Sequence, residues 1–494
     1  MRRPFTGMLG LLLAGCTVGP KYQTPTVPMT DIFKEATPVD YKTAGTWRPA
    51  QPSDGIGRGP WWQIFGDQQL NTLEDELTVS NQNLKIADAH FREARAMIGY
   101  QRAGEFPTIS VATNTSSLQD SSHQPYFLIP NPPPEGELQL GFDLNYELDL
   151  WGRIRRTVSA AREEAQATNA DLETVSLSLH AELALDYIEL RSADAQQRLL
   201  DDTVKAYTDA LRLTRNRLAG GEAPESDVAQ AQTQLDMTRV QDTDAGVLRA
   251  QYEHAIATLI GKPPAAFSLP RLPLDLQPPS IPAGIPSELL QRRPDIAATE
   301  RRVAEANDQI GIAKAAYYPS LNFSALSGFE GTSGATWFGW PSLFWAVGTS
   351  LTQELFDGGR RHAQSQIARA GYDAAVASYR QTTLTAFQQV EDNLAALRIL
   401  HDEAQQQRDA VGAADNSLRI FTNRYVGGED AYLQVITAQT AALANQRNEV
   451  DILRRRMEAS ILLVKALGGG WNASSLPQLT ERGLPRGGIV PLGW

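Results

Sequence analysis

The feature that most constrains this chain is an internal duplication that covers most of its 494 residues. Four landmarks recur, the first two after 212 residues and the last two after 207: residues 83–94 with 295–306, 106–107 with 318–319, 152–153 with 359–360, and 220–222 with 427–429. A repeat of about 200 residues is too long for a solenoid unit. We therefore expect two copies of one structural half.

Each copy contains an unusually long stretch without proline, at residues 153–218 and 360–426. At a rise of 1.5 Å per residue, such a helix reaches about 100 Å, whereas a typical globular helix has about 12 residues. Each stretch ends at a glycine pair, which favours a left-handed helix stop. A returning helix is expected from Glu225 to Ile260 and from Asp430 to Leu467. Each copy thus predicts a long helical hairpin.

A pair of alternating segments precedes each long helix. Apolar and polar residues alternate strictly over 138–148 and again over 345–352, which is typical of strands with one wet face. Their partners are expected at 108–115 and 320–329. An ordinary sandwich sheet would alternate in the same way, but the long helices do not fit a small globule. Four strands in a membrane leave edges that lipid cannot satisfy, so we expect several chains to share one barrel.

Composition excludes several classes of protein. The chain has 45 Lys and Arg against 57 Asp and Glu, a net charge of −12, which argues against nucleic acid as a partner. A mean hydropathy of −0.31 and the absence of an apolar run of about 18 residues argue against a bundle of transmembrane helices. One cysteine excludes a disulfide framework and a multi-cysteine metal site, so we expect no metal.

That cysteine, Cys16, follows a short N-terminal signal. Arg2 and Arg3 precede a short apolar stretch, and Leu13-Ala14-Gly15-Cys16 resembles a bacterial lipobox. The alternative is a stray cysteine at the end of a hydrophobic segment. Acyl chains add about 0.8 kcal/mol of membrane affinity per buried methylene. We expect a lipid anchor on Cys16, and Thr17 in the next position favours the outer membrane.

An ordered set of motifs in both repeats resembles the TolC-like outer-membrane efflux channels, specifically the OprM/NodT lipoprotein branch. The motifs are Cys-Thr-Val-Gly-Pro-Lys-Tyr-Gln-Thr-Pro at 16–25, Trp-Trp at 61–62, Glu-Leu-Asp-Leu-Trp-Gly-Arg at 147–153 and Leu-Phe-Asp-Gly-Gly-Arg at 355–360. The resemblance implies a mainly α fold with a small β-barrel portion. It also implies a homotrimer in which a twelve-stranded barrel is continued by a twelve-helix periplasmic tunnel.

On this resemblance we divide the chain into six segments. They are a lipoprotein signal peptide (1–15), an extended N-terminal segment (16–60), the first efflux-channel repeat (61–262), a proline-rich linker in an equatorial region (263–285), the second repeat (286–470) and a C-terminal tail (471–494).

The implied function is the outer-membrane channel of a tripartite efflux pump, a passive conduit that carries small toxic compounds from the periplasm to the exterior. The implied partners are an inner-membrane RND-type transporter, a periplasmic adaptor (membrane fusion) protein and outer-membrane lipid. No catalytic residue is expected, and no cofactor apart from the covalent lipid, such as palmitate, on Cys16.

The resemblance also assigns residues at the far end of the hairpins. The family's gate aspartate falls on Asp430, where three symmetry copies would form an acidic ring in a narrow pore. The alternative is that Asp430 only caps a helix that begins at Ala431. The predicted adaptor contacts are Arg217, Gly220, Gly221, Arg424, Gly427 and Gly428. The glycines serve as helix stops in either case.

Three other functions fit the sequence less well. An enzyme is disfavoured because the six histidines form no zinc-protease pair and no nucleophile motif is present. A coiled-coil tether without a pore leaves the four amphipathic strands unexplained. A conduit for protein secretion is the runner-up, and the lipobox favours small-molecule efflux over it.

Overall fold

The computed structural model describes residues 17–30, 32–35, 60–119, 121, 135–272, 274, 276–281 and 289–470. The predicted signal peptide, Cys16 and the C-terminal tail lie outside the described residues. The helices and strands in chain order are α2 (Gln68–Ser80), α3 (Gln82–Arg102), β1 (Thr108–Leu118), β2 (Glu135–Leu148), α4 (Arg153–Ala219), α5 (Glu225–Leu259), α6 (Leu289–Arg292), α7 (Pro294–Ala315), β3 (Ser320–Gly331), β4 (Leu343–Thr352), α8 (Arg360–Val426) and α9 (Tyr432–Ala466).

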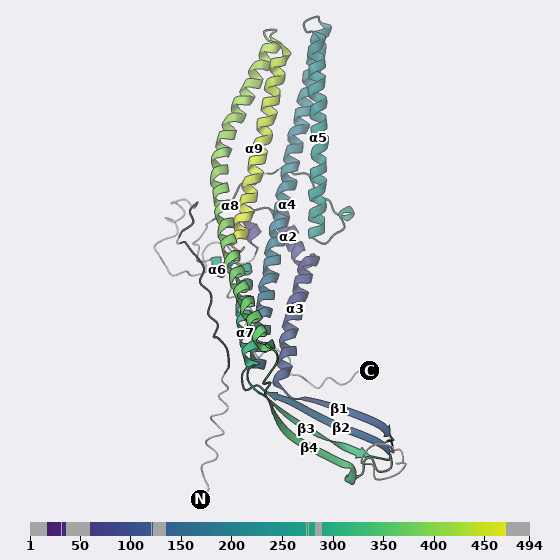
Figure 1. Ribbon diagram of the computed structural model, residues 1–494. Coiled ribbons are helices and arrows are strands. Elements are labelled where there is room, and N and C mark those ends of the chain that lie inside the picture. The colour runs from purple at the N-terminus through teal and green to yellow at the C-terminus, as the bar shows by residue number, and fades with distance from the viewer. Residues whose placement is uncertain are drawn as a thin grey trace.

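Two long helical hairpins, α4–α5 and α8–α9, lie side by side and reach two tips at the end farthest from the sheet (Figure 1). Both long helices begin at the predicted residues and end within one residue of the predicted ends. The second glycine of each pair is left-handed, with φ of 75° at Gly221 and 76° at Gly428. The predicted hairpins are therefore confirmed, together with the reason for their turns.

Two shorter helices, α3 and α7, pack against the halves of α4 and α8 nearest the sheet (Figure 1). They contain the matched segments 83–94 and 295–306. The Asn81 side chain accepts a hydrogen bond from the Leu84 backbone N–H at 3.0 Å and caps α3. Pro294 occupies the first turn of α7, where its missing N–H is not needed. α3 and α7 replace α5 and α9 as partners of the long helices.

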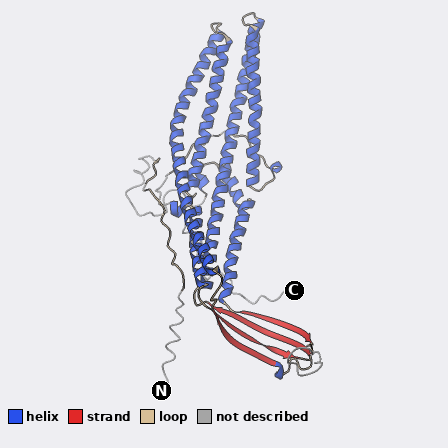
Figure 2. Cartoon of the chain, viewed as in Figure 1, coloured by secondary structure: helices blue, strands red, loops and turns tan. Residues whose placement is uncertain are grey.

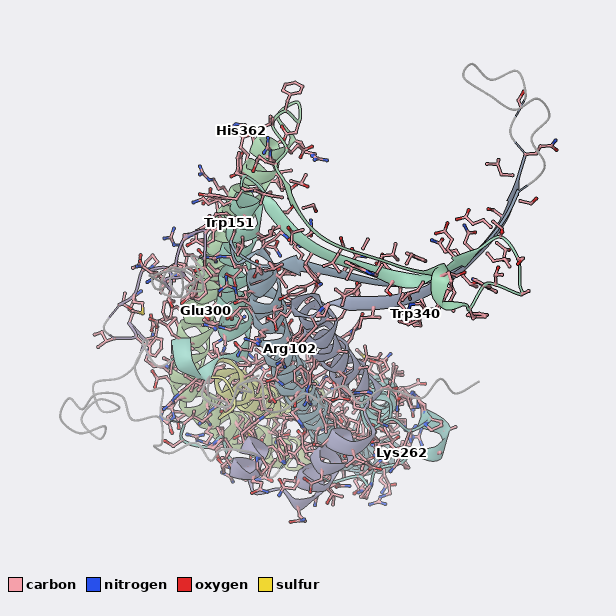
Figure 3. All side chains as sticks on the ribbon, turned by 90° about the horizontal axis from the view of Figure 1, so that it is seen from below. Arg102, Trp151, Lys262, Glu300, Trp340 and His362 are labelled. Atoms are coloured by element: carbon pink, nitrogen blue, oxygen red, sulfur yellow. The ribbon has the colours of Figure 1, made fainter. Side chains whose placement is uncertain are left out.

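The strands form one antiparallel sheet in the order β1-β2-β3-β4 (Figure 2). The predicted strands are confirmed, and β1 and β3 extend a few residues beyond the predicted ends. Seen along the helices, the sheet sweeps outward as a curved ribbon (Figure 3). Within the described part of the chain, only β1 and β4 have an edge without a partner strand. Among the described residues, no helix is both long and apolar enough to cross a membrane.

The largest buried cluster lies at the waist of the molecule, where the first hairpin meets α2 and the proline-rich linker. Its aromatic residues are Trp61, Trp62, Phe65 and Tyr187. The second hairpin has a smaller cluster at the corresponding height, built around Phe33 from the N-terminal segment. Different parts of the chain thus cover the two copies of the duplicated unit.

Residues 17–35 form an extended strap along the helices, with residue 31 outside the described part. At one end the Val18 N–H donates to the Trp151 carbonyl at 3.0 Å, beside the junction of β2 and α4. At the other end the Glu391 carboxylate accepts from the Lys34 and Glu35 backbone N–H groups, at 2.7 and 2.9 Å. The strap therefore links the base of the sheet to the middle of α8.

Candidate functional site

The two hairpin tips are joined by Arg217, near the end of α4. Its guanidinium donates to the carbonyls of Tyr425 and Val426, at 2.6 and 2.9 Å, and lies 4.8 Å from the centre of the Tyr425 ring. These carbonyls belong to the last turn of α8, where no further helical N–H is available to them. The cation thus caps the neighbouring hairpin, and only 13% of its side chain is exposed.

Arg424 is the duplicate of Arg217, but it stays within its own hairpin. Its Nε donates to Asp430 Oδ2 at 2.6 Å and its Nη2 to Oδ1 at 3.2 Å. The hydrogen bond to Asp430 raises the pKa of Arg424 above its usual value. Half of the Arg424 side chain is exposed, against 18% of Asp430. Asp430 therefore fixes the loop that follows α8.

The alternative interpretation of Asp430, in which it only caps a helix that begins at Ala431, was wrong. Helix α9 begins at Tyr432, its N-cap is Ala431, and no side chain caps it. Asp430 lies one residue before the N-cap, and Arg424 binds its carboxylate instead. The predicted tip residues Gly220, Gly221, Gly427 and Gly428 lie at the exposed turns beside these arginines. The structure thus brings together all six predicted tip residues and Asp430.

Sequence reasoning missed a layer of buried tyrosines directly behind the tips. Tyr207, Tyr425 and Tyr432 lie in one apolar cluster, and the rings of Tyr425 and Tyr432 are 5.0 Å apart. Burial raises the pKa of Tyr432 to about 12, so it is uncharged at neutral pH. The signal was present as Tyr425 and Tyr432 flanking the glycine pair. This layer makes the two tips one packed unit.

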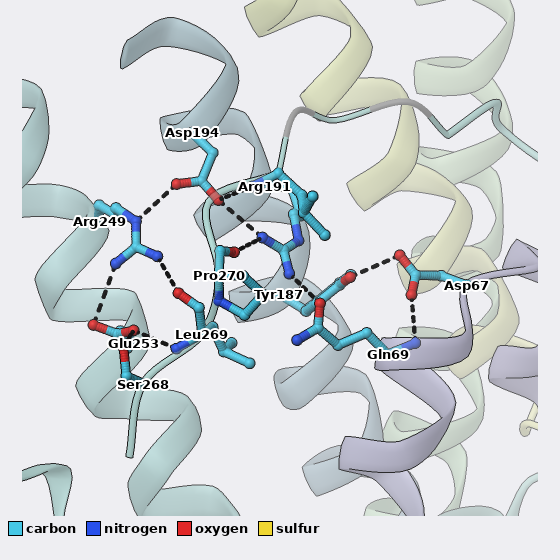
Figure 4. A network of polar contacts seen from close by, with 11 residues as sticks. Asp67, Gln69, Tyr187, Arg191, Asp194, Arg249, Glu253, Ser268, Leu269 and Pro270 are labelled. Carbon is cyan, nitrogen blue, oxygen red and sulfur yellow. Dashed lines mark hydrogen bonds and ion pairs between the residues drawn. The ribbon is translucent and has the colours of Figure 1, made fainter. Parts of the chain in front are cut away.

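A second missed feature is a network of buried charges at the waist, shown in Figure 4. Asp194 accepts from Arg191 Nη1 at 2.9 Å and from Arg249 Nε at 2.7 Å, and all three side chains are at most 10% exposed. The same arginines donate to the linker carbonyls of Pro270 and Leu269, at 2.8 and 2.7 Å. The network ties α4, α5 and the linker together. Losing one partner from such a network leaves a buried charge without compensation.

The waist also buries a carboxyl group against an imidazole. Glu74 Oε2 lies 2.6 Å from His180 Nδ1, and the Trp62 ring stacks on the imidazole at 4.4 Å. Burial raises the pKa of Glu74 to about 9 and lowers that of His180 to about 4. Both effects favour the uncharged forms at neutral pH. The pair therefore places little net charge in the apolar core.

Carboxylates also line the contact between α4 and α9. Arg454 Nη1 bridges Glu189 and Glu458, at 2.6 and 2.5 Å. Burial, then the hydrogen bond with Glu189, raises the pKa of Glu458 to about 7. Burial and the neighbouring carboxylates raise the pKa of Asp186 to about 6. The contact between α4 and α9 is therefore acidic, and its charge changes near neutral pH.

The described residues contain no group of three or more His, Cys, Asp or Glu side chains arranged to hold a metal ion. The arrangement instead offers paired charges at the tips, an acidic contact between α4 and α9, and a sheet with one apolar face. These features suit a passage for solutes.

Comparison with known proteins gives a consistent result. A family model described as outer membrane efflux protein matches residues 73–262 and 285–469. The toluene efflux pump outer membrane protein TtgC of Pseudomonas putida is 31% identical over 463 residues, covering 93% of this chain and 94% of that protein. Outer membrane protein OprJ of Pseudomonas aeruginosa is 31% identical over 489 residues, covering 96% and 97%.

The fold is also similar to solved structures. The open state of the Neisseria gonorrhoeae MtrE outer membrane channel aligns with a TM-score of 0.81 and 26% identity, over 93% of this chain and 99% of that one. The family match spans both repeats, and the structural match extends over nearly the full length of the chain.

Proposed function

This chain belongs to the outer membrane efflux protein family, and on that premise we propose that it works as a passive homotrimeric conduit in a tripartite pump. It is an outer-membrane channel component of an efflux pump, with a long periplasmic helical extension. Protein secretion, the runner-up function, is not favoured, because the relatives are efflux components. The strand edges, the N-terminal strap and the hairpin tips support the finer parts of this proposal.

The observation that carries the trimer is the pair of unpaired strand edges on β1 and β4 in the described chain. Exposed backbone N–H and C=O groups cost several kcal/mol each in lipid, so an open sheet is not viable there. Three four-stranded sheets joined edge to edge give the twelve-stranded barrel. Light scattering of the purified protein tests this. A mass of three chains supports the proposal, and a stable monomer in a membrane-like environment contradicts it.

The strap supports acylation of Cys16. Thr17 packs against Gly152, and the Val18 N–H donates a hydrogen bond to the Trp151 carbonyl. Thr17, the residue after Cys16, is therefore held where the sheet meets the helices. An acyl chain on Cys16 would therefore start at the membrane surface. Mass spectrometry of the wild type and Cys16→Ala tests this, because the variant should lose the lipid mass. Acyl chains on the variant would refute the anchor.

The tips support the contact with a periplasmic adaptor that links this channel to an inner-membrane RND-type transporter. The loops after α4 and α8 are exposed and rigid, because Arg217 and the tyrosine layer hold them. A photo-crosslinker at Ala219 should capture the adaptor in cells. The matched control places it at Glu93 on α3, far from the tips, and equal capture there would contradict tip docking.

The cargo we propose is a small toxic compound taken from the periplasm. The toluene efflux pump component among the relatives supports small molecules over proteins. A deletion strain tested against antibiotics, dyes, solvents and metals, with and without the restored gene, identifies the class. Unchanged sensitivity to every compound would contradict efflux.

A further inference from the structure

The polar face of the sheet carries two large apolar residues that do not fit the pattern. Side chains alternate between faces along each strand. The strand register assigns to the polar face, from β1 to β4, these rows: Ser110, Ala112 and Asn114; Gln139, Gly141, Asp143, Asn145 and Glu147; Asn322, Ser324, Leu326, Gly328 and Glu330; Phe344, Ala346, Gly348 and Ser350. Leu326 and Phe344 are the exceptions, and both are partly exposed.

These two side chains meet over a pair of glycines. Gly141 and Gly328 face each other across β2 and β3, and Gly328 is paired in turn with Phe344. A Cβ built on Gly141 would lie 3.5 Å from Leu326 Cδ1 and 3.9 Å from Phe344 Cζ. The Phe344 ring therefore crosses β3 and reaches β2. The side chains of Leu326 and Phe344 form a flat apolar patch on a glycine floor.

A carboxylate lies beside this patch. Asp143 is the direct cross-strand partner of Leu326, and such partners have Cβ atoms about 5 Å apart. Asn145 donates a hydrogen bond to Asp143. Glu147, farther along β2 on the same face, forms an ion pair with Arg153, with 2.6 Å between Glu147 Oε2 and Arg153 Nη2. In the described part of the chain, Asp143 has no such cationic partner.

We propose that Leu326, Phe344 and Asp143 form a contact site for organic cations with an apolar body, inside the passage through the barrel. The site rests on the proposed function, because only a closed barrel turns the polar face into a passage wall. The patch would bind the apolar body, and the carboxylate would attract the charge. Hydrated inorganic ions gain no binding free energy from the apolar patch, so the patch does not retain them.

The glycines let the two strands approach closely beneath the patch. A Cβ at position 328 would clash with the Leu140 carbonyl oxygen, so a side chain there would force β2 and β3 apart. The Phe344 ring extends over Gly141, with its Cζ 3.9 Å from the place that a Cβ at position 141 would take.

Dye binding to the purified trimer in lipid nanodiscs tests the site. Rhodamine 6G is a cation and fluorescein an anion on similar aromatic bodies, and their fluorescence anisotropy is read after subtraction of empty nanodiscs. The wild type should bind the cation at least about tenfold more tightly than the anion, since each 1.4 kcal/mol is tenfold. Phe344→Ser should weaken cation binding several-fold, whereas Phe344→Leu should keep most of it.

Three further variants separate the parts of the proposal. Asp143→Asn should remove the preference for the cation, and Leu326→Thr should weaken binding without changing that preference. Ser350→Ala, on the same face but paired with Asn322 at the other end of β4, should bind as the wild type does. Wild-type binding by both Phe344→Ser and Asp143→Asn would overturn the site. Light scattering is run first, so failure of the trimer is seen before any dye is added.

Discussion

At the scale of single residues, the matched arginines at the two tips bind different partners. Arg217 binds the end of the neighbouring hairpin, while Arg424 binds Asp430 in its own. Both lie near the end of a long helix, three residues before the glycine pair, so their sequence context is nearly identical. The difference arises because α8 lies beside Arg217, whereas no hairpin of the described chain lies beyond Arg424.

Arg217→Ala should therefore loosen the end of α8 more than Arg424→Ala loosens the end of α4. Hydrogen bonds from a charged donor are worth about 1.5–3 kcal/mol, so opening of the last turn should become about tenfold more frequent. Hydrogen exchange at the Gly427 and Gly428 amides measures the end of α8, and exchange at the Gly220 and Gly221 amides measures the end of α4. Equal effects of the two substitutions would show that Arg217 does not join the hairpins.

The Glu74–His180 pair gives a prediction about pH. Glu74 has a pKa of about 9 in the fold, against an ordinary 4.5, so its contribution to stability is present below 4.5 and is lost as the pH rises towards 9. His180 has a pKa of about 4, against 6.5, so its contribution is lost as the pH falls from 6.5 to 4. Above pH 6.5 only Glu74 of this pair still loses its contribution, and stability should fall.

Glu74→Gln should remove the part of that fall that Glu74 causes, because an amide keeps the uncharged form at every pH. The slope from one carboxyl is at most about 1.4 kcal/mol per pH unit. Thermal unfolding at pH 6.5 and 8.5 measures the difference, with Glu93→Gln on the exposed face of α3 as control. A wild type whose melting temperature is the same at both pH values would contradict a buried, uncharged Glu74.

At the scale of elements, the long hairpins were predictable because their signals are local. The absence of proline, the glycine pairs and the alternation in the strands each act within a few residues. The pairing of β2 with β3 was not predicted, because it joins the two repeats. The waist was not predictable, because Arg191, Asp194 and Arg249 meet only after α4, α5 and the linker pack together. The alternative role of Asp430 as a helix cap failed for a local reason, since Arg424, six residues earlier, binds its carboxylate.

The glycine pairs allow a matched test of the helix stops. Gly221 and Gly428 are left-handed, whereas Gly220 and Gly427 have φ of −79° and −72°, which any residue adopts. Alanine at either left-handed position should cost about 1–2 kcal/mol. Alanine at Gly220 or Gly427 should be neutral or slightly stabilising. Hydrogen exchange in the last turns of α4 and α8 measures both, and identical results at all four positions would contradict the left-handed turns.

At the scale of the whole molecule, the duplication produces a repeat unit that is unfinished at both ends. In the described chain, strands β1 and β4 are left with open edges, and α8 has a neighbour on one side only. Near the sheet the order is α3, α4, α7 and α8, so the proposed trimer would bring twelve helices around one axis. The charges near Asp430 would then be presented three times.

If Asp430 forms the gate that the family resemblance implies, Asp430→Ala should widen the tip end of the proposed trimer and raise its ion conductance in planar bilayers several-fold. The substitution would release Arg424 and remove three carboxylates from that gate, so cation selectivity should fall as conductance rises. Glu429→Gln is the matched control, because Glu429 is 65% exposed and lies 3.9 Å from the same guanidinium. If Asp430→Ala leaves both conductance and selectivity unchanged, Asp430 has no part in the gate and serves only to fix the loop before α9.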